Sequence, residues 1–320
     1  MIKDAFFRKN GQPIPTKNIE LEEDGLFVPM YEEFQEILAQ LNSSENFSID
    51  GIDFKLLLKW EFNAHAKKFG NNQYLIAIRS GVVGQVLTLM KESSSYFTKR
   101  YKHFLEVEPP VVFGCTLIWM QLFGHELGHI MRGHLELQKS GEMNLLDEAP
   151  TESLFLDIPD DLYDNSNELQ FLIEMDADNF SATFVGQQLL KLIDKSLEQD
   201  CFDIEELVDL CVSSILIFFI FVSEQSALTD RYPNPLTRAE TVISSVFLFI
   251  DGKTPLSKYQ LDNIKSIALK ETLSAFMVNL GSVKFLKDDS IDHWMDSSVK
   301  AEQKYPEFCR YLSEKSIVLR

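Results

Sequence analysis

Two histidines and a glutamate lie close together in the sequence at a spacing that suits a metal site. His125 and His129 are four residues apart in the run HELGH, and residues four apart lie on the same face of an α-helix. The two imidazoles can therefore bind one Zn²⁺ ion, at about 2.0–2.1 Å in such sites. Glu126 can reach the open coordination position and act as a general base. The alternative is a pair of core histidines that face an acidic neighbour without any metal.

A catalytic zinc ion normally has three protein ligands, so the sequence must supply one more. The longer pattern H-E-x-x-H-x-x-G-x-x-H is absent, because Arg132 stands where its glycine would be. Downstream, the run EMDAD places Glu174 and Asp178 on one helix face. We expect Glu174 to be the third ligand and Asp178 to fix the tautomer of a ligand imidazole. Asp176 points off that face and is expected to be solvated. The alternative is an ordinary acidic surface stripe.

The remaining histidines have no comparable partner motif. His134 follows His129 by five positions, which rotates it off the ligand face of a continuous helix, although Gly133 makes the local geometry uncertain. We expect His134 to be a non-ligand histidine. His65, together with His103 and His293, is expected on the surface or as a satisfied core residue.

These motifs together carry a family resemblance. HELGH, followed by His134 and then by EMDAD, resembles the gluzincin peptidases of the M48 type, whose pattern is HExxH followed by ExxAD. A narrower likeness is to the Lit-type phage-exclusion peptidases, cytoplasmic bacterial members of this broad group. Those proteins carry His-Pro and then an arginine five residues after the proline, and Pro233 and Arg238 have that spacing here. The resemblance covers residues 72–250.

The resemblance implies a zincin-like metallopeptidase fold and a zinc-dependent endopeptidase. Its substrate would be an intracellular protein or peptide, in phage exclusion or in a stress response. Tyr232 stands at the position of the family's histidine and could donate a hydrogen bond to the oxyanion of the reaction, as could Arg238. The alternatives are that Tyr232 is a turn residue and that Arg238 caps a helix and pairs with acidic residues.

The same residues are compatible with a second class of function. A catalytically silent or latent zincin-fold protein could act as an interaction or sensor module. Every residue that catalysis needs is present, which argues against decay, but a latent enzyme that needs a trigger would look identical. Zinc content and proteolysis separate these alternatives.

The composition indicates a folded chain of 320 residues with a formal net charge of −19. Such a chain repels phosphate backbones, so nucleic acid is not an expected partner. Cys115 and Cys211 lie in apolar runs and no C-x-x-C pair is present, which favours reduced thiols. The N-terminus has no apolar stretch of signal-peptide length. The apolar runs 111–124 and 210–223 are shorter than the about 20 residues that cross a bilayer. We therefore expect a cytoplasmic protein without a membrane span.

The hydrophobic pattern places the metal motifs on helices. Helical spacing predicts helices at 27–41, 81–97, 111–138, 168–197, from residue 203, at 236–250, 259–280 and 297–312. Strands are expected at 54–62 and 73–78, joined as a hairpin with a turn at residues 70–72, although the connection 63–69 could also be helical. The expected fold is α+β and predominantly helical, with a small N-terminal β-sheet.

One catalytic domain is expected over residues 1–250, with a helical extension over residues 251–320 packed on the same domain. The strand 74–78 could offer a free sheet edge to an extended peptide substrate. The acidic connection 140–166 could cover the site as a lid.

Overall fold

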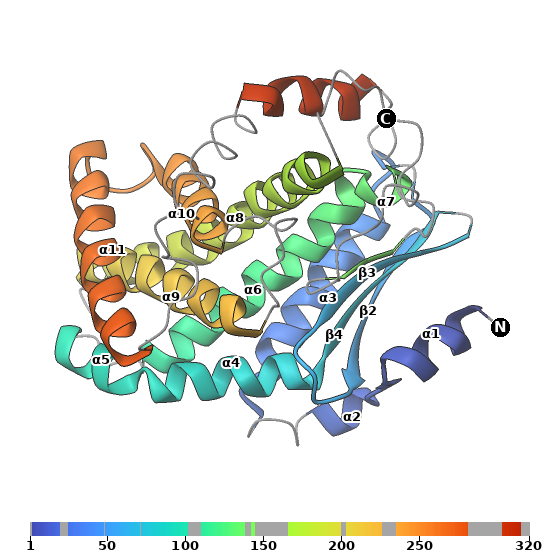
Figure 1. The fold of residues 1–320 in the computed structure, drawn as a ribbon, viewed down its shortest axis with the longest axis horizontal. Helices are drawn as coiled ribbons and strands as arrows, with labels where there is room; N and C mark the ends of the chain where they lie inside the picture. Colours follow the sequence, from blue (N-terminus) through green and yellow to red (C-terminus); the bar gives the residue numbers. More distant parts are fainter. Residues whose placement is uncertain are drawn as a thin grey trace.

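A computed structural model describes the chain over residues 2–19, 25–47, 49–70, 72–101, 110–137, 142–144, 166–199, 203–225, 235–280 and 303–314. Over these residues the protein is predominantly helical with a small mixed sheet, as the sequence predicts (Figure 1). The sheet lies at one side of the molecule and most helices lie at the other.

The helices are α1 (Ile2–Asn10), α2 (Thr16–Ile19), α3 (Val28–Asn42), α4 (Ser80–Glu92), α5 (Ser94–Arg100), α6 (Pro110–Met131), α7 (His134–Leu137), α8 (Ser166–Gln199), α9 (Ile204–Gln225), α10 (Pro235–Ile250), α11 (Lys258–Leu280) and a helix over residues 303–314. Two predicted helices are shorter than expected. The segment 81–97 breaks at Ser93, where α4 ends and α5 follows. The segment 111–138 ends at Met131, and Gly133 with a φ of 76° separates it from α7.

The sheet contains β1 (Gln12–Pro13), β2 (Gly51–Leu58), β3 (Ala64–Phe69), β4 (Gln73–Arg79) and β5 (Glu142–Asn144), in the order β1-β2-β4-β3-β5. The predicted hairpin between the first two strands is wrong. β2 and β4 run parallel, and the connection between them contains β3, which forms the hairpin with β4. The segment AHAKKF of β3 has no β-branched residue, so its composition gave little strand signal.

β4 is an internal strand of this sheet. It pairs with β2 on one side and with β3 on the other. The expectation that residues 74–78 offer a free edge to a peptide is therefore wrong, because both rows of backbone hydrogen-bonding groups already have partners. Helix α6 contacts both β3 and β4, and the second neighbour of β3 in the sheet is β5.

Helices cover both faces of the sheet. On one face, Phe6 of α1 packs with Leu57 and Phe69. On the other face, Phe123 of α6 stacks on Phe34 of α3 at 4.1 Å between ring centroids, and both rings contact Phe54 of β2. Successive side chains along a strand point to opposite faces of the sheet. Phe54 therefore contacts α6 on one face, while Leu57, three positions later, contacts α1 on the other.

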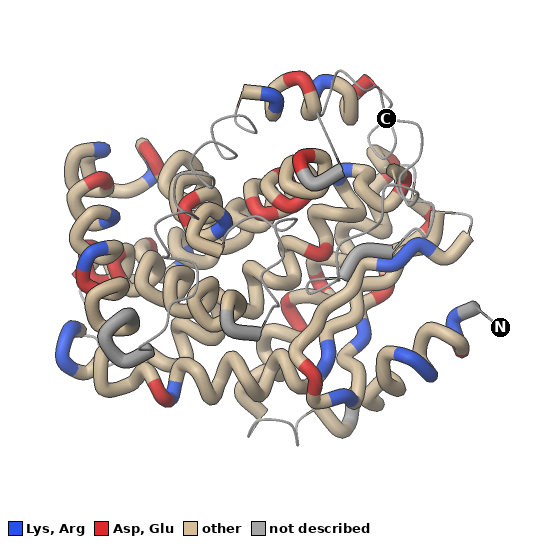
Figure 2. The backbone as a smooth tube through the Cα atoms, in the orientation of Figure 1, with Lys and Arg blue, Asp and Glu red and all other residues tan. Residues whose placement is uncertain are grey.

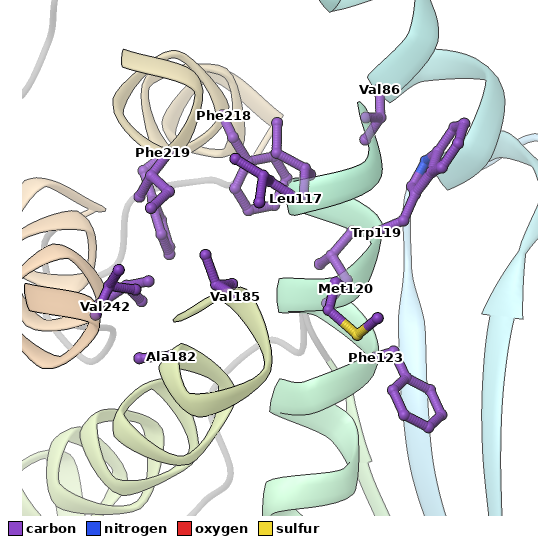
Figure 3. Close-up of a cluster of buried hydrophobic side chains, with 14 of the residues drawn as sticks. Val86, Leu117, Trp119, Met120, Phe123, Ala182, Val185, Phe218, Phe219 and Val242 are labelled. Atoms are coloured by element: carbon purple, nitrogen blue, oxygen red, sulfur yellow. The ribbon is translucent and has the colours of Figure 1, made fainter. Parts of the chain in front are cut away.

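The other side of α6 packs against α8 and α9, and α10 packs on α8 and α9 in turn. Figure 3 shows the apolar side chains of these helices and of α4 that meet there, among them Val86, Leu117, Met120, Ala182, Val185, Phe218, Phe219 and Val242. α6 is therefore buried all round, which explains why its hydrophobic pattern is nearly continuous.

α9 is a long and strongly apolar helix. Its segment Ile204–Ser223 is longer than the run 210–223 that stood out in the sequence, and by length and composition it could cross a membrane. However, 89% of its apolar window is buried inside the molecule. That burial is typical of a core helix in a folded protein. α11 packs against α9, and its Leu261 and Ile264 join the same core.

Candidate metal centre

Small residues let α6 and α8 approach each other closely where they cross. A Cβ atom on Gly124 would lie 3.0 Å from the Cα of Ser181, and Gly128 faces Ala177 in the same way. The helices therefore meet backbone to backbone at this point. The side chains that flank the crossing, which belong to HELGH and to EMDAD, are brought together as a consequence.

Three potential metal ligands converge at the crossing. One ligand atom from each of His125, His129 and Glu174 lies within 4.8 Å of the others. The two Nε2 atoms are 3.0 Å apart, and the Glu174 carboxylate is 3.3 Å from Nε2 of His125 and 3.9 Å from that of His129. Atoms that bind one tetrahedral zinc ion lie about 3.3 Å from one another. Two imidazoles and a carboxylate also form a ligand set that catalytic zinc uses, so these residues fit Zn²⁺.

Glu126 lies beside this group with its carboxylate inside the molecule. Neither of its oxygens forms a hydrogen bond of normal geometry among the described residues, although the backbone of Ala66 on β3 is near enough to favour the charged form. Burial raises the pKa of Glu126 to about 8, and the negative charge of Glu174 adds to that shift. A carboxylate with a pKa near neutrality can both accept and return a proton.

Asp178 and Arg238 contact two of the three potential ligands, His125 and Glu174. The Asp178 carboxylate is 2.8 Å from Nδ1 of His125 and accepts two hydrogen bonds from Arg238, at 2.7 and 2.9 Å. Arg238 also lies 3.4 Å from the Glu174 carboxylate. Burial alone would raise the pKa of Glu174, but Arg238 and the two histidines outweigh it and lower that pKa to about 2. Both carboxylates are therefore held in their charged forms.

The two ligand histidines have opposite electrostatic surroundings in the metal-free protein. Burial lowers the pKa of His125, but the charge and the hydrogen bond of Asp178 overcome it and raise that pKa to about 9. Burial and the neighbouring charge of His125 lower the pKa of His129 well below its ordinary value. At neutral pH the proton therefore lies on His125, and His129 is neutral. A metal ion that bound both rings would displace that proton.

His134 and Asp176 form a second supporting pair, which the sequence analysis missed. Because Gly133 interrupts the helix, the ring of His134 turns back, and its Nδ1 lies 3.0 Å from Nδ1 of His129. Its Nε2 lies 3.0 Å from the Asp176 carboxylate. The expectation that Asp176 is solvated is wrong, since only 1% of this residue is exposed. His134 is not part of the three-residue ligand group.

Other predicted residues lie elsewhere. Tyr232 and Pro233 fall in residues 226–234, outside the described part of the chain, as do His103, His293 and most of the connection 140–166. His65 is buried on β3, and Cys115 and Cys211 are buried free thiols.

No protein-family model, curated protein or solved structure matches the chain.

Proposed function

We propose that this chain is a zinc-dependent endopeptidase of the gluzincin type. The observation that carries the proposal is the convergence of His125, His129 and Glu174 within 4.8 Å, with the buried carboxylate of Glu126 beside them. A metal ion also accounts for the close approach of the two imidazoles, whose Nε2 atoms lie 3.0 Å apart beside the Glu174 carboxylate inside the molecule.

In this proposal each residue has a separate task. A zinc ion bound by His125, His129 and Glu174 would polarise the scissile carbonyl and lower the pKa of its bound water. Glu126 takes a proton from the attacking water and returns it to the leaving amine. Asp178 holds Nδ1 of His125 so that Nε2 points toward Nε2 of His129 and the Glu174 carboxylate, the other two residues that would bind zinc.

The surroundings of the site support a zincin-like fold. A mixed sheet packs against the helix that carries both histidines, and the next long helix supplies the glutamate. Arg238 contacts Asp178 and Glu174, so we assign it mainly to charge balance within the site. The proposed substrate is an intracellular protein or peptide, in phage exclusion or a stress response. The net charge of −19 favours such a partner over nucleic acid.

The decisive experiment compares metal content and proteolysis in matched variants. The wild type should purify with, or bind on reconstitution, one zinc ion per chain, and His129→Ala should bind none. Glu126→Gln should retain zinc and lose the hydrolysis of fluorescein-labelled casein and of a mixed-sequence peptide library. Glu174→Ala should weaken zinc binding strongly. Glu92→Gln makes the same exchange at an exposed position of α4 and should behave as wild type. Full proteolysis by Glu126→Gln would falsify the assigned mechanism.

The alternative is a silent or latent zincin-fold protein that acts as an interaction or sensor module. Burial favours latency, because His125, Glu126 and Glu174 are each 0% exposed, and a peptide cannot reach them without some opening. Zinc binding with no hydrolysis of either probe, in wild type and Glu126→Gln alike, would support this alternative.

A further inference from the structure

Asp176 is the meeting point of three separate segments of the chain. Its carboxylate accepts hydrogen bonds from Arg132 at 2.7 and 3.0 Å, lies 3.0 Å from Nε2 of His134, and accepts a hydrogen bond from the hydroxyl of Tyr305 at 2.6 Å. Tyr305 belongs to the helix over residues 303–314, 129 positions further along the chain. A distant helix therefore contacts a group that supports the metal site.

The helix 303–314 is docked on the site by more than this one bond. Phe308 is fully buried and its ring stacks on that of His134, with centroids 6.2 Å apart. Lys304 donates a hydrogen bond to Glu168 of α8 at 3.0 Å. Figure 1 shows the helix crossing above α6 and α8, and Figure 2 shows charges of both signs alternating along it. Glu307 and Arg310 of this helix are exposed, whereas Phe308 and Leu312 are buried and the Tyr305 hydroxyl contacts Asp176.

The hydrogen-bond directions along this chain of groups are fixed once His129 binds a metal through Nε2. Its Nδ1 must then carry a proton, and the nearest acceptor is Nδ1 of His134 at 3.0 Å. His134 must in turn carry its proton on Nε2, which lies 3.0 Å from the Asp176 carboxylate. Each N–H in this series then has an acceptor: His129 donates to His134, and His134 donates to Asp176. Both histidines are neutral in this arrangement.

The other ligand has a different support. His125 reaches a carboxylate directly, because its Nδ1 lies 2.8 Å from Asp178, and that carboxylate is held by Arg238. His129 reaches its carboxylate only through His134. The ring of His129 therefore depends on two groups being in place, and the second of them is held by the helix 303–314.

We propose that the helix 303–314 is a positioning element of the metal centre, in which Tyr305 acts through Asp176 and His134 to hold the ring of His129. The proposal rests on the metal site proposed above. Tyr305 is a positioning residue, since it contacts neither the metal ligands nor the reacting groups. Hydrogen-bond partners behind a ligand histidine fix its tautomer and its orientation, and their loss lowers metal affinity by about 10–100-fold.

The test uses the full chain and two matched variants of the same helix. Tyr305→Phe removes the hydroxyl that contacts Asp176 and keeps the ring, whereas Lys304→Met breaks the contact with Glu168 and leaves Asp176 untouched. Zinc affinity is measured by competition with a chelating dye. Tyr305→Phe should bind zinc about tenfold more weakly than wild type, and Lys304→Met should bind it equally well.

A spectroscopic measurement separates positioning from general stability. In the Co²⁺-loaded protein, the Nδ1 protons of the two ligand histidines should give separate paramagnetically shifted resonances. Tyr305→Phe should accelerate solvent exchange of the His129 proton and leave the His125 proton unchanged. Asp176→Asn, which keeps the shape but removes the charge, should do the same.

The possible outcomes separate this proposal from the proposed function. Equal loss of zinc affinity in Tyr305→Phe and Lys304→Met, or no change in either, would overturn the positioning role while the peptidase remained intact. A wild type that binds no zinc would overturn both. A wild type that binds zinc but hydrolyses nothing would remove the peptidase and leave the positioning role to be decided by the affinity and exchange data.

Discussion

Gly128 and Ala177 are in backbone contact where α6 crosses α8. A Cβ atom on Gly128 would lie 3.2 Å from the Cα of Ala177 and 3.3 Å from its carbonyl oxygen. Backbone atoms within a helix cannot rotate away from such a contact. The glycine inside the HELGH motif therefore determines how close EMDAD comes to the two histidines.

Gly128→Ala should separate α6 from α8 and weaken the metal site. The added methyl group meets backbone, so the helices must shift by a few tenths of an ångström, and Glu174 shifts with α8. We expect zinc affinity to fall by about tenfold or more, measured by competition with a chelating dye. Gly114→Ala is the control on the same helix, because its methyl group meets the side chains of Met90 and Ser214 rather than the backbone of α8. Equal zinc affinity in both variants would contradict this role.

Arg238→Met should destabilise the metal-free protein more than the zinc-loaded one. The arginine is 3% exposed and balances the buried carboxylates of Asp178 and Glu174. Removing one partner of a buried ion pair costs about 3–5 kcal/mol, but a bound zinc ion would supply part of the missing positive charge. Urea unfolding with and without a chelator measures both losses. Arg8→Met, at an exposed position of α1, should change neither, and identical losses in the two states would argue against charge balance by Arg238.

Removal of zinc should lower the stability of the wild type. A ligand that binds only the folded state stabilises it by about 4 kcal/mol at a thousand times its dissociation constant. Calorimetry should therefore show a lower melting temperature after chelation, restored by Zn²⁺. His129→Ala should melt at one temperature under both conditions. Mg²⁺ should not replace zinc, because it prefers oxygen ligands. A wild type whose melting temperature ignores zinc would refute the site.

The metal-free protein should lose stability as the pH rises from about 6.5 to 9. The pKa of His125 is raised to about 9 in the folded state, so its contribution is complete below its unfolded pKa of about 6.5 and disappears as the pH approaches 9. Glu126, whose pKa rises from 4.5 to about 8, adds to the decline over the lower part of that range. Urea unfolding at several pH values in the presence of a chelator measures the slope. Glu126→Gln should flatten it below pH 8, and a stability that rises with pH would contradict the assignment.

Local spacing was sufficient to predict which side chains share a helix face. The four-residue spacing of His125 and His129, and that of Glu174 and Asp178, is a property of each helix alone. The structure brings all four residues together with Arg238. Tyr232 stays a prediction, since it lies outside the described residues.

The sheet was harder to predict because its pairing is not local. β2 and β4 are parallel neighbours, and a parallel pair always requires a connecting segment between the strands. That segment contains β3, whose two alanines and two lysines resemble neither a buried strand nor an amphipathic helix. The predicted turn at Gly70 is present, but it joins β3 to β4 and not the strand 54–62 to the strand 73–78.

The second supporting pair was missed for two physical reasons. A continuous helix would turn His134 away from His129, but the positive φ of Gly133 ends α6 and redirects the chain. Asp176 was expected in solvent because nothing near it in the sequence indicates a covering element. The helix that covers it contributes Tyr305 from far along the chain, and no periodic pattern within α8 could reveal that contact.

The contact between Tyr305 and Asp176 also sets an order of events during protein synthesis. HELGH and EMDAD leave the ribosome long before residues 303–314, and α6 and α8 can pack as soon as both are outside. The hydrogen bonds behind His129 remain incomplete until the later helix follows and docks. A nascent chain would therefore hold the ring of His129 less firmly than the finished protein does, until Tyr305 reaches Asp176.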